Sequence, residues 1–434
     1  MNWRKVLQLT LVHVGVSITV VPVTSTLNRV MIADLGFSAL FVGFLISLPY
    51  LLSPLQVVMG SWSDRHPVWG RHRSPWIVLG GLMASFGSYL TAHAAYLMVD
   101  QPALGLFACL AAFTVWGMGV NIASVSYLSL VSDLTEGQPG WRSRAVSVMW
   151  TAMILSTIIT AIALSRMLDT YTVETLYTAF GAVWFVASAL VLFGAAGIEP
   201  ASEMQERLFD RSDQGLSALR VLTTNPSAQR FFFYLLLVLI SIHAQDVLLE
   251  PYGGEVLGMP VAQTSRLTAV WGIGVFITLL GGLPLIRRIG KKPTANIGAF
   301  IAAAGFALII ASGVVESASA LMGAVLVLGL GGGLMTVSNL SFMLDMTVPQ
   351  AVGLYMGAWG VANFAGQAIG NILSGFLRDG MLALTGDAFY GYALVFGLEI
   401  VGLLLAVLIF SAISVRQFQH DAEITVSDVL AAAD

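Results

Sequence analysis

Two acidic side chains and an amide, Asp246, Glu250 and Gln245, stand on the last two turns of an otherwise apolar segment. Asp246 and Glu250 are four residues apart, so on a helix they lie on one face, about one turn from each other. A charge at membrane depth is costly, and an intramembrane carboxyl group is therefore a candidate functional group by default. Two close carboxyl groups can share one proton, so this pair suits a proton relay.

Two histidines accompany polar residues in the same kind of apolar segment. His13 shares a helical face with Asn28, and His243 precedes Asp246 by three residues. Imidazole is a common metal ligand, so either ring could supply an axial nitrogen to the magnesium of a chlorin. The residues leave three interpretations open, namely pigment ligands, a proton relay and plain hydrogen bonding between helices.

Long apolar segments must position these groups. Of the 434 residues 57% are hydrophobic and 10% are charged, whereas a soluble domain carries about 25% charged residues. This composition excludes a soluble protein, and only helices satisfy the backbone of such segments in lipid. We predict an all-α membrane protein with twelve transmembrane helices, at 6–32, 38–62, 75–99, 103–131, 145–167, 175–198, 230–250, 262–286, 294–314, 319–344, 352–377 and 388–413.

The basic residues indicate how the twelve segments are oriented in the membrane. If the N-terminus is cytoplasmic, 16 of the 20 Lys and Arg residues fall on the cytoplasmic side of the twelve segments and four on the other. Such a bias is typical of membrane proteins. We therefore expect both the N-terminus and the C-terminus to be cytoplasmic.

The longest polar interval divides the chain into two sets of six segments. We predict an N-terminal six-helix half at 1–198, a cytoplasmic linker at 199–229, a C-terminal six-helix half at 230–413 and a cytoplasmic tail at 414–434. Leucines between the charges of the linker suit either one amphipathic helix or a solvated tether. The plan of six and six resembles that of the major facilitator superfamily.

A polar loop after the second segment supports this assignment. It resembles the loop signature of the superfamily, although three extra residues separate its acid from its second glycine, and the signature residues are Gly60, Asp64, Arg65, Gly70, Arg71 and Arg73. A second copy follows the eighth segment, from Gly282 to Lys292, and lacks the acid. Gly60 would permit close helix approach, and Asp64 could pair with a basic residue or a helix N-terminus.

The sequence offers no sign of an enzyme. It contains no phosphate loop, dinucleotide fingerprint, metal-spaced Cys/His set or nucleophile elbow. The single cysteine, Cys109, excludes a disulfide framework and a zinc cluster. We expect no catalytic residue, no nucleic-acid partner and no metal beyond a possible chlorin magnesium at His13 or His243.

Four stretches together resemble the bacteriochlorophyll delivery family of PucC and LhaA proteins, a branch of the superfamily. They are Leu27–Ile32, Pro54–Trp76, Gln245–Met259 and Gly353–Gly360 with the exit Leu377–Asp379. The run from Gln245 to Met259 is the most specific of them, and the resemblance extends from about residue 4 to about residue 413.

The resemblance implies a membrane protein of phototrophic bacteria that receives (bacterio)chlorophyll and passes it to newly inserted pigment-binding polypeptides. Light-harvesting or photosystem polypeptides would be its partners, together with membrane lipid and, in this view, pigment-synthesis enzymes. (Bacterio)chlorophyll or a precursor would be its cargo, and no other cofactor is indicated. The membrane would be the cytoplasmic, intracytoplasmic or thylakoid membrane.

The candidate residues for pigment binding or for lining a cavity combine motif membership with polar chemistry: His13, Asn28, Arg29, His243, Gln245, Asp246, Glu250 and Tyr252. We expect Arg29 to reach the membrane surface or to pair with Asp34. Two other functions remain open, a proton-coupled secondary transporter of a small or amphipathic solute that works through Asp246 and Glu250, and a scaffold that never touches pigment.

Overall fold

The computed structural model describes the backbone of residues 2–68, 70–199, 225–347 and 352–419, and the named elements in these ranges are all helices. The all-helical fold class is therefore confirmed. In chain order the elements are α1 (Trp3–Ser17), the π-helical turns η1 (Pro22–Leu27) and η2 (Val30–Asp34), α2 (Ala39–Leu51), α3 (Leu55–Arg65), α4 (Ser74–Asp100), α5 (Pro102–Leu134), α6 (Pro139–Met167), α7 (Val173–Ala195), α9 (Pro226–His243), α10 (Gln245–Glu255), α11 (Val261–Ile289), α12 (Lys291–Val314), α13 (Ala318–Asp345), α14 (Val352–Thr385) and α15 (Ala388–Ser411).

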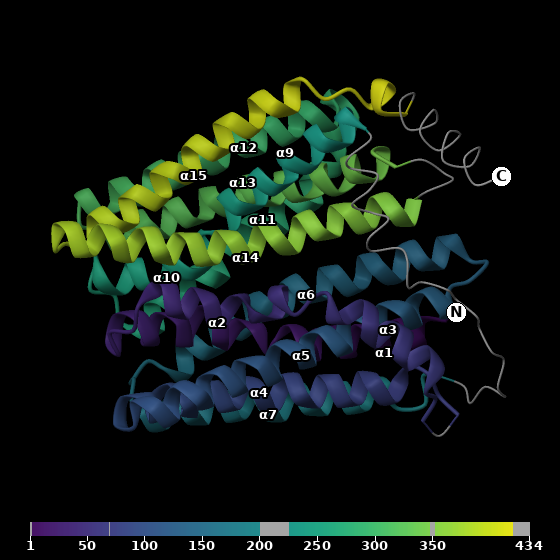
Figure 1. Ribbon diagram of the computed structural model, residues 1–434, viewed down its shortest axis with the longest axis horizontal. Helices are drawn as coiled ribbons and strands as arrows, with labels where there is room; N and C mark the ends of the chain where they lie inside the picture. The colour runs from purple at the N-terminus through teal and green to yellow at the C-terminus, as the bar shows by residue number, and fades with distance from the viewer. Residues whose placement is uncertain (1, 69, 200–224, 348–351, 420–434) are drawn as a thin grey trace. The chain divides into compact units, whose positions relative to one another are not determined.

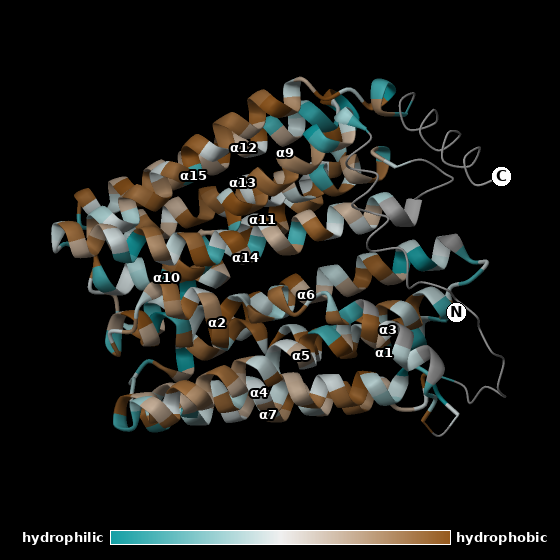
Figure 2. Ribbon diagram, in the orientation of Figure 1, coloured by the Kyte–Doolittle hydropathy of each residue, from teal (hydrophilic) through white to brown (hydrophobic). Residues whose placement is uncertain are grey.

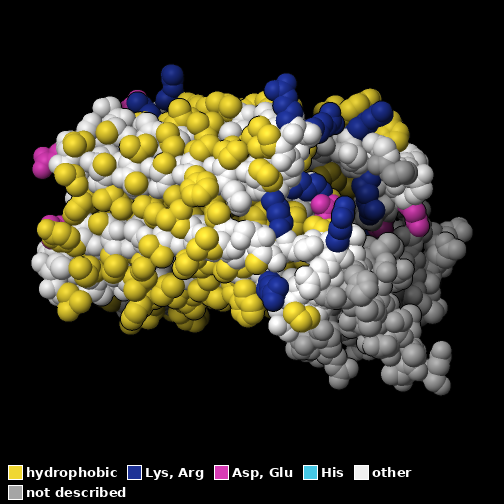
Figure 3. All heavy atoms as spheres, turned by 90° about the horizontal axis from the view of Figure 1, so that it is seen from above, with side chains coloured by type: hydrophobic (Ala, Val, Ile, Leu, Met, Phe, Trp, Pro, Cys, Tyr) yellow, Lys and Arg dark blue, Asp and Glu magenta, His cyan; other side chains and the backbone are white. Residues whose placement is uncertain are grey.

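Within the described ranges, ten helical stretches are long and apolar enough to cross a membrane. Figure 2 shows hydrophobic residues along the helices and hydrophilic residues mainly near their ends. Figure 3 shows hydrophobic side chains spread over much of one face of the protein, with most Lys and Arg side chains in the right half of the view. Large apolar side chains such as Phe185 and Phe193 are more than 70% exposed (74% and 72%). Lipid must cover such a surface, so the protein is an integral membrane protein.

Two of the twelve predicted segments are not among these ten. The segment 38–62 is split, because α2 ends at Leu51 after 13 residues and α3 begins at Leu55. The segment 352–377 lies in α14, a helix of 34 residues whose amides lower its hydropathy. The count of twelve crossings therefore stays a prediction.

The interruption between α2 and α3 has a polar partner inside the protein. The carbonyl of Pro49, near the end of α2, accepts a hydrogen bond from Asn121 Nδ2 of α5 at 2.8 Å. Non-helical backbone at membrane depth is tolerated where the protein itself satisfies it. Asn121 is 5% exposed, so solvent does not compete for this bond.

The chain forms two compact units, Met1–Phe209 with Asp246–Gly272 and Asp210–Gln245 with Ile273–Asp434. The residues of α10 after Gln245, and the first part of α11, thus pack with the first unit. The predicted six-helix halves at 1–198 and 230–413 concern membrane crossings and stay a prediction, as does the cytoplasmic tail.

Helices α4 and α5 of the first unit lie side by side along their lengths (Figure 1). Glycines allow this close approach: a Cβ on Gly80 would lie 2.5 Å from the backbone nitrogen of Ala123, and one on Gly119 would lie 2.2 Å from that of Ala84. Both distances are too short for a real side chain, and small residues at helix contacts are typical of membrane bundles.

The second unit repeats this packing with α12 and α13. A Cβ on Gly331 would lie 2.4 Å from the backbone nitrogen of Ala302, and one on Gly370 of α14 would lie 2.9 Å from the carbonyl oxygen of Ile240 in α9. Several glycines of the tenth and eleventh predicted segments therefore serve ordinary helix packing.

One predicted helix end is wrong. The seventh segment was predicted to end at residue 250, just before Pro251 and the glycines that follow it, but α10 runs through Pro251 to Glu255. The interruption lies earlier, at Ala244 between α9 and α10. The linker, for which either an amphipathic helix or a solvated tether was predicted, falls largely on residues 200–224, outside the residues that the structure describes.

Candidate functional site

A hydrogen bond from another helix explains why α10 can contain a proline. In an α-helix the carbonyl of Val247 accepts from the backbone N–H four residues later, and that residue is Pro251, which has none. The side chain of Asn28 takes this place, since its Nδ2 donates to Val247 O at 2.9 Å and to Asp246 O at 3.3 Å. Asn28 is 0% exposed. The Asn28 amide therefore fixes the end of the first segment to α10 and supplies the hydrogen bond that Pro251 cannot donate.

Asn28 lies between the two π-helical turns that continue α1 to Asp34. Such turns are rare and frequently lie at functional sites. The first begins at Pro22, which also lacks a backbone N–H. The sequence placed Asn28 on the bundle-facing side by regular helical spacing. The side chain is buried as expected, but the wider turns, and not that spacing alone, set its direction.

Arg29 forms a second link between the same segments. Its Nη2 donates to Met259 O at 3.1 Å, and its Nη1 forms an ion pair with Asp34. The pairing with Asp34 is one of the two outcomes that the sequence predicted. A Cβ on Gly254 would lie 2.9 Å from Arg29 Nε, so a larger residue there would require Arg29 or α10 to shift. The side chain is buried rather than extended to the membrane surface.

A short chain of hydroxyl and carboxyl groups lies beside these links. Thr268 Oγ1 of α11 lies 2.6 Å from Glu250 Oε1 and 2.8 Å from Ser25 Oγ. Glu250 is 5% exposed, and Thr26 and Ser265 form a parallel hydroxyl contact at 3.0 Å. A hydroxyl group carries one proton, so Thr268 can donate to the carboxylate or to Ser25 but not to both. The chain can therefore invert its hydrogen bonds when Glu250 gains a proton.

We use the term junction for Ser25–Asp34, Asp246–Met259 and Ser265–Thr268, all of the first unit. Asp246 is half-buried and its backbone carbonyl belongs to the junction, while Tyr252 is fully buried in α10. Gln245 is buried at the start of α10, where the chain passes from the second unit to the first.

His13 lies away from the junction residues that it was predicted with. His13 belongs to α1, and Asn28 follows it by 15 positions, so the two are roughly 20 Å apart along the helix. Its ring lies 5.1 Å from that of Tyr127 and 6.0 Å from that of Trp150, measured between centroids, and its buried Nδ1 has no hydrogen-bond partner among the residues that the structure describes. His243 is half-buried at the end of α9, in the second unit.

The loop signature lies at the end of α3 and in the turn that follows. Gly60 belongs to α3, and Gly70 has a φ of 68°, a conformation that favours glycine. Arg71 is half-buried. Asp64 and Arg65 end the helix, and their side chains lie outside what the structure describes. The pairing predicted for Asp64 therefore stays a prediction.

Arg73 connects this loop to the end of α5. It is 7% exposed, its Nη1 donates to Ser63 Oγ at 2.7 Å and its Nε lies 3.4 Å from Asp133 Oδ2. In the second unit Lys291 holds a similar place, since its Nζ donates to Asp345 Oδ2 at the end of α13 at 2.6 Å. The second copy of the loop lacks its own acid, and α13 supplies one.

Sequence reasoning missed the role of Glu199. Its carboxylate follows α7 and accepts backbone N–H bonds from His72, Arg73 and Ser74 at 2.6–3.1 Å. It therefore satisfies backbone donors at the start of α4, where the positive end of the helix dipole favours an anion. The sequence had assigned Glu199 to the linker because it lies in a run of charges.

Sequence reasoning also missed Ser25, Thr26, Ser265 and Thr268. Their only signal was the clustering of hydroxyl residues at the end of the first segment and the start of the eighth. Within the described residues, no group of three or more His, Cys, Asp or Glu side chains is placed to hold a metal ion. The junction can hold a proton, bind polar groups of a ligand and fix two irregular helices to each other.

Comparison with known proteins places this arrangement in a family. The model of the PUCC protein family matches residues 26–418. Protein PucC of Cereibacter sphaeroides is 32% identical over 91% of this chain and 89% of its own length. A protein of Rhodobacter capsulatus named bacteriochlorophyll synthase 44.5 kDa chain is 29% identical over 92% of each chain.

Solved structures of membrane transporters have the same fold. The nucleoside transporter NupG aligns with a TM-score of 0.74 and 16% identity, over 94% of this chain and 99% of its own. A D-xylose–proton symporter aligns with a TM-score of 0.72 and 14% identity, over 96% and 99%. At such identities the likeness concerns the fold, which is that of major facilitator superfamily transporters.

Proposed function

The chain belongs to the PUCC protein family, and we propose that it is an integral-membrane (bacterio)chlorophyll delivery and assembly factor. It binds the pigment and hands it to newly inserted light-harvesting or photosystem polypeptides, without catalysing a reaction itself. The observation that carries this proposal is the family match over residues 26–418, together with a relative that is named as a chain of bacteriochlorophyll synthase.

The proposal includes twelve membrane crossings with both termini in the cytoplasm. The bias of basic residues supports this orientation. The protein would reside in the cytoplasmic, intracytoplasmic or thylakoid membrane of a phototrophic bacterium, where pigment-synthesis enzymes supply the cargo. His13 and His243 are the residues proposed to offer an axial nitrogen to the chlorin magnesium.

The geometry of the junction favours a structural role for most of its polar groups. The Asn28 amide and the Arg29 guanidinium both bond to backbone carbonyls, which fixes the first segment to α10. A pigment with a long apolar tail is itself soluble in lipid, so its transfer within the membrane requires no alternating access. A fixed junction is compatible with such lateral transfer.

Gentle purification from the native membrane, followed by pigment extraction, tests this proposal. We expect about one chlorin per chain, with antenna or photosystem polypeptides in the same fraction. The His13→Ala/His243→Ala double variant tests the proposed magnesium ligands. A native protein that is colourless, stable and monodisperse would contradict pigment delivery and favour a scaffold.

A proton-coupled secondary transporter is the second candidate, because the buried Glu250 belongs to a chain of hydroxyl groups that can invert its hydrogen bonds. The two functions differ in their dependence on the Glu250 charge. Glu250→Gln keeps an oxygen that accepts from Thr268 but cannot bind and release a proton.

In cells that lack the native chain, the delivery function predicts that Glu250→Gln restores light-harvesting absorbance to the level given by the wild-type gene. The transporter function predicts that Glu250→Gln abolishes proton-driven flux and fails to restore the absorbance. Immunoblotting for equal amounts of protein in the membrane is the control.

A further inference from the structure

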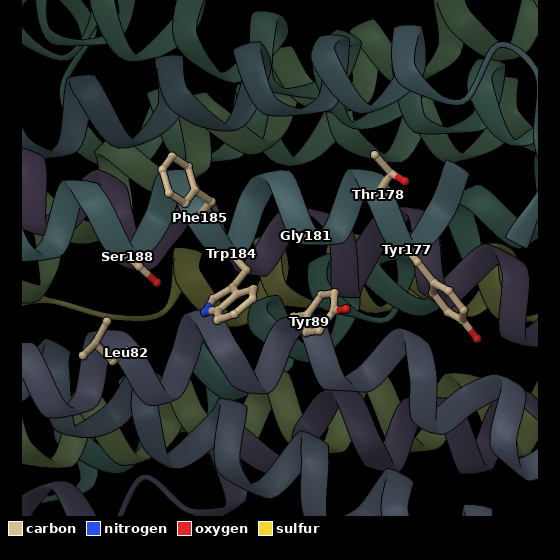
Figure 4. Close-up of a pocket in the computed structure, with 8 residues that line it drawn as sticks. All are labelled: Leu82, Tyr89, Tyr177, Thr178, Gly181, Trp184, Phe185 and Ser188. Atoms are coloured by element: carbon tan, nitrogen blue, oxygen red, sulfur yellow. The ribbon is translucent and has the colours of Figure 1, made fainter. Parts of the chain in front are cut away.

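A groove of about 560 Å³ runs between α4 and α7 in the first unit, apart from the residues of the junction. Leu82 and Tyr89 line it from α4, and Gly181, Trp184, Phe185 and Ser188 line it from α7. Figure 4 shows the rings of Tyr89 and Trp184 next to each other between the two helices. Its volume lies within the range of about 300–1,000 Å³ that is usual for small-molecule sites.

The walls of the groove are mostly aromatic rings in ordered contact. Tyr89 stacks on Trp184 with 5.2 Å between centroids and 23° between planes. Tyr177, which also lines the groove, stacks on His93 at 3.9 Å and 25°. These contacts fix flat surfaces before any ligand arrives, and a planar conjugated ligand gains most from such surfaces.

A belt of aromatic residues at the membrane surface explains only some of the aromatic residues that line the groove. Tyr177 is close to the helix end at Val173 and suits such a belt. Trp184 lies 11 residues from that end, which is about 16 Å along the helix. Phe185 is 74% exposed and Trp184 38% exposed. The groove therefore opens sideways at hydrocarbon depth, where a ligand arrives through lipid.

Polar groups and a space without a side chain complete the groove. Ser188 Oγ lies 2.9 Å from Ser85 Oγ, and the single Ser85 hydroxyl proton can go to Leu82 O at 3.1 Å or to Ser188. When Ser85 donates to Ser188, the Ser188 hydroxyl keeps its own proton for a ligand carbonyl. Gly181 leaves the middle of the groove open: a Cβ there would have Tyr89 Cε2 at 3.7 Å as its nearest neighbour. Glycine thus keeps room for a flat ring against the Tyr89 and Trp184 pair.

We propose that the α4–α7 groove binds the flat macrocycle of a chlorin that enters from the lipid, with its ring against Tyr89 and Trp184 and a ring carbonyl near Ser188. The identity of the ligand rests on the proposed delivery function, whereas the location rests on the groove alone. A lipid acyl chain also fits apolar space, but it gains nothing from stacked rings or from a hydroxyl donor.

Binding of chlorophyll a to the purified full chain in lipid nanodiscs tests this site. The probe is titrated into wild-type protein, Gly181→Leu and Trp184→Ala, and binding is followed by the induced visible circular dichroism of the chlorin. Gly397→Leu is the matched control, because Gly397 also lies within a spanning helix, is half-buried and has open space around its Cβ position. Gel filtration verifies that each variant is folded.

We expect roughly tenfold weaker chlorophyll binding for both groove variants, because Trp184→Ala removes a ring contact and Gly181→Leu fills the space for the macrocycle. Gly397→Leu should bind chlorophyll as the wild-type protein does. Chlorophyll binding that is equal in all four proteins would overturn the groove as its site and leave the delivery function standing. No chlorophyll binding by the wild-type protein would overturn both. Quenching of Trp184 by lipids with brominated acyl chains, unchanged when chlorophyll a is added, would identify an acyl chain as the occupant and contradict the proposal.

Discussion

Asn28 and Pro251 form a matched pair at the scale of single residues. The proline removes the donor that Val247 O would otherwise have, and the Asn28 amide replaces it from a segment 219 residues away. Arg29 and Gly254 also contact each other closely, because the guanidinium occupies space that a side chain at position 254 would enter. The two motifs, at Asn28 and at Gln245–Met259, therefore contain residues that contact each other, and a motif residue here need not contact a ligand.

Replacement of Asn28 tests this pairing. Asn28→Ala leaves the Val247 carbonyl without its donor in a buried place, and we expect a loss of stability of about 1–3 kcal/mol. Pro251→Ala returns a backbone N–H to α10, so the same replacement should cost clearly less in that background. Thermal unfolding of the four proteins of this double-mutant cycle, in one detergent, measures the coupling. Equal losses in both backgrounds would contradict the pairing.

Gly254→Ala tests the second match. The added methyl group must displace Arg29 or α10, and we expect a loss of about 1–3 kcal/mol, typical of overpacking. The control is Gly397→Ala, where nothing lies within 4 Å of the new Cβ. At such an open helical position alanine is neutral or stabilising. Similar melting temperatures for the two variants would argue against a close contact at Gly254.

The sequence indicated part of this site. The position of Asn28 in the bundle and the pair of Arg29 with Asp34 follow from motif membership and charge. The partners Ser25 and Thr268 do not, because hydroxyl groups in membrane helices commonly bond to their own backbone, as Thr24 does to Val20 O. Polarity alone therefore does not reveal which hydroxyl reaches another helix.

At the scale of elements, each unit has an equivalent corner where a basic residue meets the end of a neighbouring helix. Arg73 precedes α4 and pairs with Asp133 of α5, and Lys291 begins α12 and pairs with Asp345 of α13. In both cases glycines bring the paired helices close together. The loop signature was visible in the sequence, but the acids that serve it lie more than 50 residues later and could not be assigned from spacing.

Glu199 adds a further feature to the first unit, because its carboxylate accepts from the backbone N–H groups at the N-terminus of α4. We expect Glu199→Ala to destabilise the protein by about 0.5–2 kcal/mol, as loss of a helix cap does, and Glu199→Gln to cost less, because it keeps an acceptor without the charge. Hydrogen exchange of the amides of residues 72–74 gives the local readout. Exchange at wild-type rates in Glu199→Ala would show that the cap is not formed.

Helix ends were the weakest part of the sequence prediction. Proline and glycine predicted the end of the seventh segment at Pro251, yet the helix continues because Asn28, distant in sequence, supplies the missing donor. The interruption at Ala244 carries no proline or glycine signal. Hydrophobic length identified most segments well, since the cost of unsatisfied backbone in lipid leaves few alternatives.

At the scale of the whole molecule, the fold of a transporter superfamily carries a proposed function in pigment delivery. The fold supplies helices that cross the membrane and flanks that face lipid. Function must be argued from sites, because one fold serves many activities. The α4–α7 groove and the junction, both in the first unit, are such sites.

The orientation has its own test. Cys109 is the only cysteine and is buried, so Cys109→Ser gives a background for single cysteines. An impermeant maleimide should label Asn2→Cys and Gln419→Cys only from the cytoplasmic side and Thr170→Cys only from the opposite side. Labelling of Asn2→Cys and Gln419→Cys from different sides would contradict an even number of crossings.

The most direct test of the central claim is pigment transfer between reconstituted proteins. The purified chain, loaded with chlorophyll a or bacteriochlorophyll a, is placed in vesicles with a freshly inserted light-harvesting polypeptide and without any ion gradient. The spectral shift of pigment bound by that polypeptide is then followed over time. We predict transfer in the absence of a gradient, faster than from vesicles that contain pigment alone. No acceleration by the chain, or transfer only under an imposed proton gradient, would contradict delivery.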